Sequence, residues 1–98
     1  MHDTEWLSEM FKKYDDEFLK FESIESPANE RPDLCAFLIL DQLAPGSSDM
    51  VTTAEHDKIY LEVEPEDLAK VITESDIRDL IRCGIMYDED ENLLWMFV

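Results

Sequence analysis

Apolar residues recur at helical spacing over the first part of the chain. Between residues 4 and 24 they fall within one arc of about 100° on a helical wheel. The residues of this arc are Leu7, Met10, Phe11, Tyr14, Phe18 and Phe21. Asp3 or Thr4 can accept the free amide protons of a first turn. The pattern predicts one amphipathic helix over residues 4–24 that lays an aromatic-rich face on the core.

The apolar run at residues 34–40 fits either a buried strand or a buried helix, because periodicity alone does not separate the two. Pro32 suits a first helical position, Asp33 suits a first turn, and Pro45 with Gly46 supplies a stop. We therefore favour a helix. Since its apolar residues cover nearly every direction, we expect it to be the central helix of the core.

Two strands are expected at residues 50–54 and 58–63. Apolar and polar residues alternate in the second of them, which gives one buried face and one wet face. A hairpin would join the strands across His56 and Asp57. This dipeptide is not a favoured two-residue turn, so the register stays open.

The remaining segments predict two short helices and a closing hairpin. One helix covers residues 65–72, and the other begins at an N-cap near Thr73 and stops at Gly84. Residues 85–88 and 93–98 form the hairpin, around an acidic turn.

Both faces of the last strand are apolar, so both need cover. It is either a central strand between two layers, or one of its faces meets another chain, which would give a homodimer or another assembly. If one face is uncovered, we expect that apolar interface to consist of Leu94, Met96 and Val98.

These elements predict a single α+β domain over residues 1–98, with three to four helices packed on a small, mainly antiparallel sheet. No internal repeat or linker divides the chain. A domain of this size has room for one core and little for a deep, enclosed active site.

Charge narrows the choice of partners. The chain has 25 Asp and Glu against eight Lys and Arg, a formal charge of −17. Such a surface repels phosphate backbones and anionic lipid, so we expect no direct binding to nucleic acid or to a membrane. The N-terminus does not resemble a signal peptide, and Cys35 and Cys83 suit buried free thiols in a reducing compartment. We therefore expect a cytoplasmic protein.

Part of the acidity has a structural explanation. Carboxylates at predicted helix starts oppose the helix dipole, and Glu9 with Lys13, or Glu74 with Arg78, has the order of a favourable i,i+4 pair. The excess costs stability through self-repulsion, and either solubility or a partner can account for it. The expected partner-binding acidic residues are Asp15, Glu22, Glu25, Glu62, Glu64, Asp88, Glu89, Asp90 and Glu91.

Motifs for chemistry are weak. Asp88, Asp90 and Asn92 have the alternation of a calcium loop, but Leu93 stands where that motif needs Gly. No nucleophile elbow, phosphate-binding loop or dinucleotide fingerprint occurs. We therefore expect no catalytic residue, no cofactor and no metal site.

The leading hypothesis is a non-enzymatic acidic interaction or inhibitor protein that binds a basic protein partner. In a more specific version of this hypothesis, the partner is a nucleic-acid-binding protein, and this chain blocks its binding groove as a DNA mimic. Immunity proteins of nuclease toxins and DNA-mimic proteins of phages resemble this chain in composition and size, though they share no motif with it. One alternative is a small metal-binding protein or metal-dependent enzyme that uses Glu55, His56 and Asp57. Another is a structural subunit or homo-oligomer.

Overall fold

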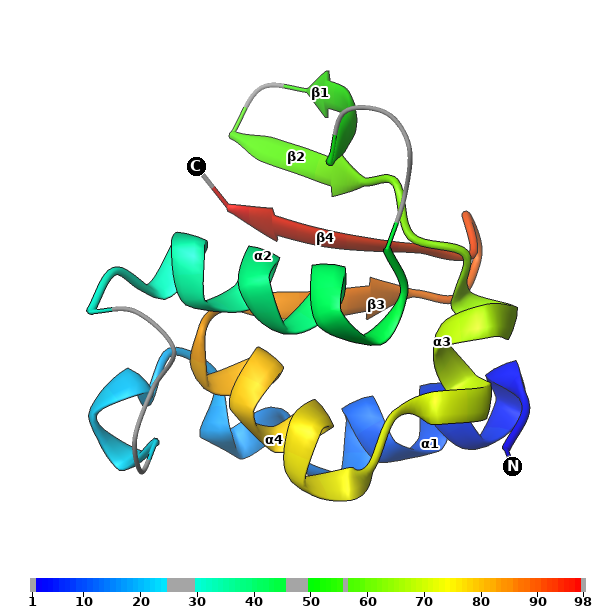
Figure 1. Cartoon of the computed structure of the whole chain (residues 1–98), viewed down its shortest axis with the longest axis horizontal. Helices are drawn as coiled ribbons and strands as arrows, with labels where there is room; N and C mark the ends of the chain where they lie inside the picture. Colours follow the sequence, from blue (N-terminus) through cyan, green and yellow to red (C-terminus); the bar gives the residue numbers. More distant parts are fainter. Residues whose placement is uncertain (1, 25–29, 46–49, 56, 98) are drawn as a thin grey trace.

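Four helices, two 3-10 turns and four strands make up the described part of the chain (Figure 1). The computed structural model describes residues 2–24, 30–45, 50–55 and 57–97, with the backbone alone at 52, 53 and 55. The elements are α1 (Thr4–Lys13), η1 (Asp15–Glu17), η2 (Phe21–Ser23), α2 (Pro32–Leu43), β1 (Val51–Glu55), β2 (Lys58–Leu61), α3 (Pro65–Val71), α4 (Glu74–Arg82), β3 (Ile85–Asp88) and β4 (Leu93–Phe97).

The strands form one antiparallel sheet in the order β1-β2-β4-β3. Both expected hairpins, β1–β2 and β3–β4, are present, and β4 is a central strand between β2 and β3. The α+β prediction is confirmed, with helices packed on a small antiparallel sheet. The Cα radius of gyration is 12.2 Å, close to the roughly 13 Å expected for a folded domain of this length.

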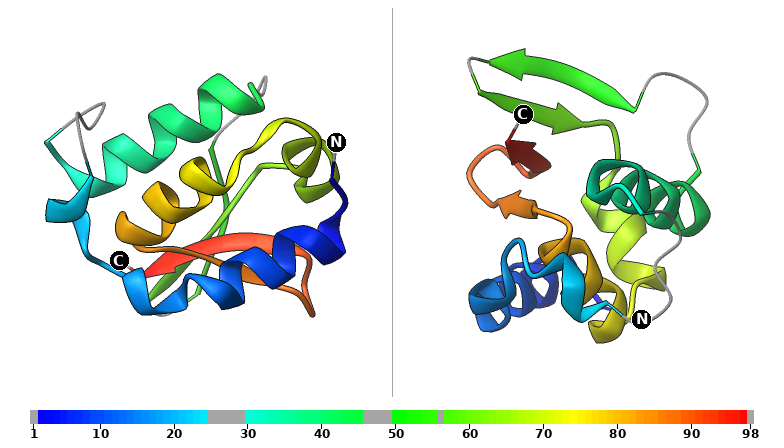
Figure 2. Two further views of the ribbon diagram at one scale, coloured as in Figure 1. Left: turned by 90° about the horizontal axis from the view of Figure 1, so that it is seen from below. Right: turned by 90° about the vertical axis from the view of Figure 1, so that its left-hand side faces the viewer.

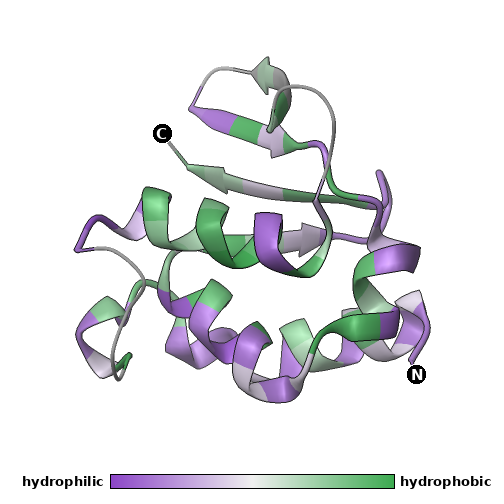
Figure 3. Ribbon diagram, viewed as in Figure 1, coloured by the Kyte–Doolittle hydropathy of each residue, from purple (hydrophilic) through white to green (hydrophobic). Residues whose placement is uncertain are grey.

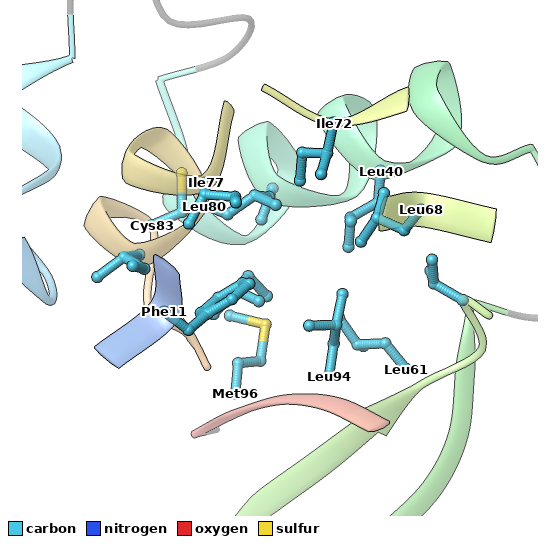
Figure 4. Packing of buried hydrophobic residues seen from close by; sticks show 14 of the residues in the cluster. Phe11, Leu40, Leu61, Leu68, Ile72, Ile77, Leu80, Cys83, Leu94 and Met96 are labelled. Carbon is cyan, nitrogen blue, oxygen red and sulfur yellow. The ribbon is translucent and has the colours of Figure 1, made fainter. Parts of the chain in front are cut away.

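The core lies between one face of the sheet and the helices (Figures 2 and 4). Leu61 and Leu94 project from the sheet towards Leu40 of α2, Leu68 of α3 and Leu80 of α4, and all five are fully buried. Because antiparallel side chains alternate between faces, this core uses every second residue of β2 and β4. The other face of the sheet points away from the helices.

The first helix ends at Lys13, so the prediction that it continues to residue 24 is wrong. The chain turns instead through η1 and η2, and Leu19 adopts a left-handed φ of 63°. Its amide donates to the carbonyl oxygen of Ile81 at 3.1 Å, which fastens this segment to the end of α4. Phe18 and Phe21 still pack against the core, so irregular backbone satisfies the same apolar pattern.

Residues 34–40 are helical, as predicted, but α2 is not the central helix of the core. Only Cys35, Ala36 and Leu40 are buried in it, whereas Leu34 and Leu38 are 39% and 47% exposed. The ribbon of α2 is apolar along most of its length (Figure 3), yet the helix lies on the outside of the domain, and none of the described helices or strands covers its outer side.

The predicted signals around α4 are confirmed. Thr73 and Asp76 form a capping box at its start. Gly84 follows its end with a φ of 101°, a conformation that L side chains rarely adopt. Within the described residues, no helix has both the length and the apolar character needed to span a membrane.

Candidate partner-binding surface

Two acidic segments lie at the same end of the molecule. The β2–α3 link carries Glu62 and Glu64, and the β3–β4 turn carries four further carboxylates, Asp88, Glu89, Asp90 and Glu91. Figure 1 and the left-hand view of Figure 2 show both segments at the end of the molecule where α1 begins. All six are exposed except Asp88, which is half-buried. We call these six residues the acidic end.

The other expected acidic residues do not join the acidic end. Glu22 lies in η2, at the opposite end of the molecule (Figure 1), whereas Asp15 lies in η1 and lines a small hollow together with Glu89. Glu25 lies outside the described residues. The acidic surface expected from the sequence is thus not continuous, because the chain from α1 to η2 carries Glu22 away from the β3–β4 turn.

Local hydrogen bonds shape the β3–β4 turn. The Asp88 carboxylate accepts from the amides of Asp90 and Glu91 at 3.0 and 3.1 Å, which is an Asx-type turn. Asn92 takes a left-handed φ of 55°, and its side-chain oxygen accepts from the Tyr87 hydroxyl at 2.5 Å. These bonds commit Asp88 to the backbone and leave Asp90 and Glu91 exposed to solvent.

A polar groove separates α1 from this turn. It has a volume of about 530 Å³, and its lining residues are Thr4, Glu5, Ser8, Glu9, Lys12, Tyr87, Glu89 and Asn92. A smaller hollow of about 110 Å³ continues it towards Phe11, Asp15 and Met86. Glu5 and Glu9 are exposed on the α1 side, so the groove extends the acidic end along this helix.

Glu89 crosses the groove and fixes the turn to α1. Its carboxylate accepts from the buried Ser8 hydroxyl at 2.6 Å and from the Lys12 ammonium at 3.1 and 3.2 Å. The Ser8 hydrogen bond, followed by Lys12, lowers the pKa of Glu89 below its ordinary value. Glu89 was expected to bind a partner, but its charge is already paired within the chain.

The basic residues are largely engaged with carboxylates outside the turn. Arg78 and Arg82 both bind Glu17, whose side chain is 14% exposed, and Arg82 also pairs with Asp79. The pKa of Glu17 is lowered, mainly by the Arg78 hydrogen bond. Further ion pairs join Lys13 to Glu74, Lys70 to Asp67 and Arg31 to Asp33. Among the described residues, Glu62, Glu64, Asp90 and Glu91 belong to none of these pairs.

Both cysteine side chains lie in the core. Cys35 and Cys83 are free and buried, as predicted. Burial, with a smaller contribution from the neighbouring Cys35, raises the pKa of the Cys83 thiol far above its ordinary value. Because the thiolate is the reactive form, Cys83 is a poor nucleophile. Burial likewise raises the pKa of Tyr87, and the nearby Glu89 and Asp88 add to this, so its hydroxyl stays protonated at neutral pH.

A metal site finds no support in the parts of the chain that the structure describes, where no three His, Cys, Asp or Glu side chains converge. The expectation for Glu55, His56 and Asp57 falls mainly outside those parts. His56 is not described, Glu55 is described by its backbone alone, and Asp57 is exposed in the β1–β2 turn.

The expected apolar interface needs a correction. Leu94 and Met96 are 0% and 7% exposed and belong to the core, because the helices pack on their side of β4. Val98 lies outside the described residues. Trp95 and Phe97 occupy the opposite face, where Phe97 is 47% exposed. Alternation shows that the strand has two apolar faces, but it does not show which of them the helices will cover.

Comparisons of this chain with protein-family models, with curated proteins and with solved structures give no match.

Proposed function

We propose that this protein is a non-enzymatic interaction protein that docks its acidic end on a basic protein. The observation that carries the proposal is the distribution of charge. Six carboxylates from two segments gather at one end, and no Lys or Arg occurs in residues 59–69 or 83–98, which contain those segments. Lys12 reaches one of the six, Glu89, across the groove.

Electrostatic steering explains what this distribution can do. Opposite charge accelerates association by orders of magnitude, and like-charge repulsion rejects other acidic partners. The groove adds a place where a basic side chain can enter between Glu5, Glu9 and the turn. A partner that presents a basic nucleic-acid-binding surface has the charge that this end would attract, and occupying that surface would inhibit it.

Variants in which carboxylates are replaced by neutral amides test the location of the binding surface. The acidic-end variant replaces four exposed carboxylates by amides: Glu62→Gln, Glu64→Gln, Asp90→Asn and Glu91→Gln. The matched control removes the same number of exposed charges elsewhere: Asp16→Asn, Glu22→Gln, Glu30→Gln and Asp41→Asn. Both variants have the same net charge, so they differ only in where the charge is lost.

Immobilised protein is used to capture binding proteins from lysate, followed by elution with increasing salt. We expect wild type and the control to retain one basic protein and the acidic-end variant to release it at much lower salt, since fewer close charge pairs remain. Equal loss in both variants would show attraction to net charge alone and would contradict the proposal. Release of the captured protein by added duplex DNA would support the inhibitory form.

A further inference from the structure

The sheet has an aromatic outer face. In register across the three strands β2, β4 and β3, Tyr60 lies opposite Trp95 and Trp95 lies opposite Met86. In the next row Lys58 lies opposite Phe97. These five residues are called the aromatic face. Phe97 is 47% exposed and the other four are half-buried.

The described helices leave this face open. They lie on the other side of the sheet or below its β3 edge, as the right-hand view of Figure 2 shows. Residues on the inner side of the same strands, such as Leu61, Ile85 and Leu94, are fully buried. Phe18 borders the face and meets the Phe97 ring edge-on, with centroids 6.4 Å apart.

A cation already rests on the centre of the aromatic face. The Lys58 ammonium lies 4.3 Å from the centroid of the Trp95 ring. The Trp95 and Phe97 rings are perpendicular, with centroids 4.9 Å apart. The lysine contact shows that the indole is placed to hold a positive group by cation–π attraction.

Carboxylates surround the aromatic face without entering its central row. Asp57 precedes β2, Glu62 follows it, and Asp88 ends β3. The row of Tyr60, Trp95 and Met86 contains no charged residue. An aromatic and methionine centre with a polar, charged rim is the anatomy of a protein interface, in which the central aromatic residues provide most of the binding energy.

We propose that the aromatic face docks a segment of the basic partner in which arginine alternates with aliphatic residues. The inference rests on the proposed function and adds a second contact to it. Arginine suits the site because a guanidinium stacks flat on an aromatic ring while its N–H groups reach carboxylates at the rim. A second copy of this chain suits it less, since each copy has a net charge of −17.

Three short synthetic peptides of equal length serve as probes. One alternates Arg with Leu, the second alternates Arg with Ser at the same charge, and the third alternates Glu with Leu. Binding to the full chain is measured by NMR titration, which follows the Trp95 indole N–H and the β2 and β4 amides. We expect the Arg–Leu peptide to shift these signals and to bind about tenfold more tightly than the Arg–Ser peptide.

Two variants probe the face itself. Phe97→Ser removes the most exposed ring and should reduce the Arg–Leu preference about tenfold, without changing Arg–Ser affinity. Met86→Ser is an independent variant on β3, should Phe97→Ser fail to fold as judged by circular dichroism. Lys58→Met frees the Trp95 ring and should increase the ratio of Arg–Leu to Arg–Ser affinity.

The outcomes separate this inference from the proposed function. Equal binding of both arginine peptides, with shifts only at Asp90 and Glu91, would overturn the docking inference and support the acidic end. Failure of both arginine peptides to bind would contradict both. Tighter binding of the Glu–Leu peptide, or self-association that Phe97→Ser abolishes, would assign the aromatic face to a different occupant.

Discussion

Glu17→Gln should destabilise this protein although it reduces a large excess of negative charge. The Glu17 carboxylate accepts four hydrogen bonds from Arg78 and Arg82, at 2.5 to 3.3 Å. It thereby ties η1 to α4 across 61 and 65 residues of sequence. An amide keeps one of the two acceptor oxygens, carries no charge and replaces the other oxygen by an N–H donor, so it cannot reproduce the four charge-assisted hydrogen bonds.

The burial of the pair sets the magnitude. Arg82 and Glu17 side chains are 15% and 14% exposed, which places them between surface ion pairs, worth roughly 0.2 to 1 kcal/mol, and buried pairs, whose disruption costs roughly 3 to 5 kcal/mol. Asp79 stays beside Arg82 at 3.3 Å and partly compensates. We expect a loss of about 2 kcal/mol in the free energy of unfolding.

The assay is urea unfolding followed by circular dichroism at low salt. With an m-value of about 1.3 kcal/mol/M for a domain of this size, the midpoint should fall by about 1.5 M. Glu22→Gln is the matched control, because Glu22 is an exposed carboxylate in the neighbouring turn η2. It should leave the midpoint unchanged or raise it slightly, by relieving self-repulsion. Equal midpoints for the two variants would refute the reasoning.

The pH dependence gives a second check. The pKa of Glu17 is lowered in the folded state, chiefly by the Arg78 hydrogen bond. Its stabilisation is therefore complete above the ordinary glutamate pKa and is lost as pH falls through the lowered value. The gap between wild type and Glu17→Gln should be widest near neutral pH and should close in strong acid. A gap that persists there would mean that shape, and not charge, holds the segment.

Other positions give further predictions. Gly84→Ala should lower the melting temperature by several degrees, because φ is 101° and the added Cβ would come within 3.0 Å of Leu19; a variant as stable as wild type would contradict this. Leu94→Ala should cost about 2 to 5 kcal/mol, since Leu94 is fully buried in the core, and denaturant unfolding measures it. Ser8→Ala should raise the pKa of Glu89 towards its ordinary value, because the first cause of its lowering is removed; carboxyl NMR titration checks this, and an unchanged pKa would assign the shift to Lys12.

For the acidic end, the sequence predicts the number of carboxylates but not their grouping in space. Composition alone identifies the excess of carboxylates, because side-chain charge does not depend on the fold. Their grouping does depend on it. The β2–α3 link and the β3–β4 turn meet at one end because β2 and β4 are antiparallel neighbours, which places the end of β2 beside the start of β4.

Ion pairing was also decided by tertiary structure. Local spacing predicted Glu9 with Lys13 and Glu74 with Arg78, but Lys13 pairs with Glu74 and Arg78 with Glu17. Local i,i+4 pairs are worth only a few tenths of a kcal/mol. Packing α1 and η1 beside α4 offers partners at greater sequence separation, and the partly buried carboxylate of Glu17 gains more from two guanidiniums than an exposed neighbour could provide.

The sequence predicts both hairpins and most of the helix boundaries, because caps, prolines, glycines and side-chain periodicity act locally. It indicated Thr73, Gly84 and the two-faced last strand correctly. Two features depend instead on contacts between distant segments: the first helix ends at Lys13, and Leu94 rather than Trp95 faces the core. Apolar periodicity predicts which side chains are buried. The element that packs on them depends on contacts between segments that are distant in the sequence.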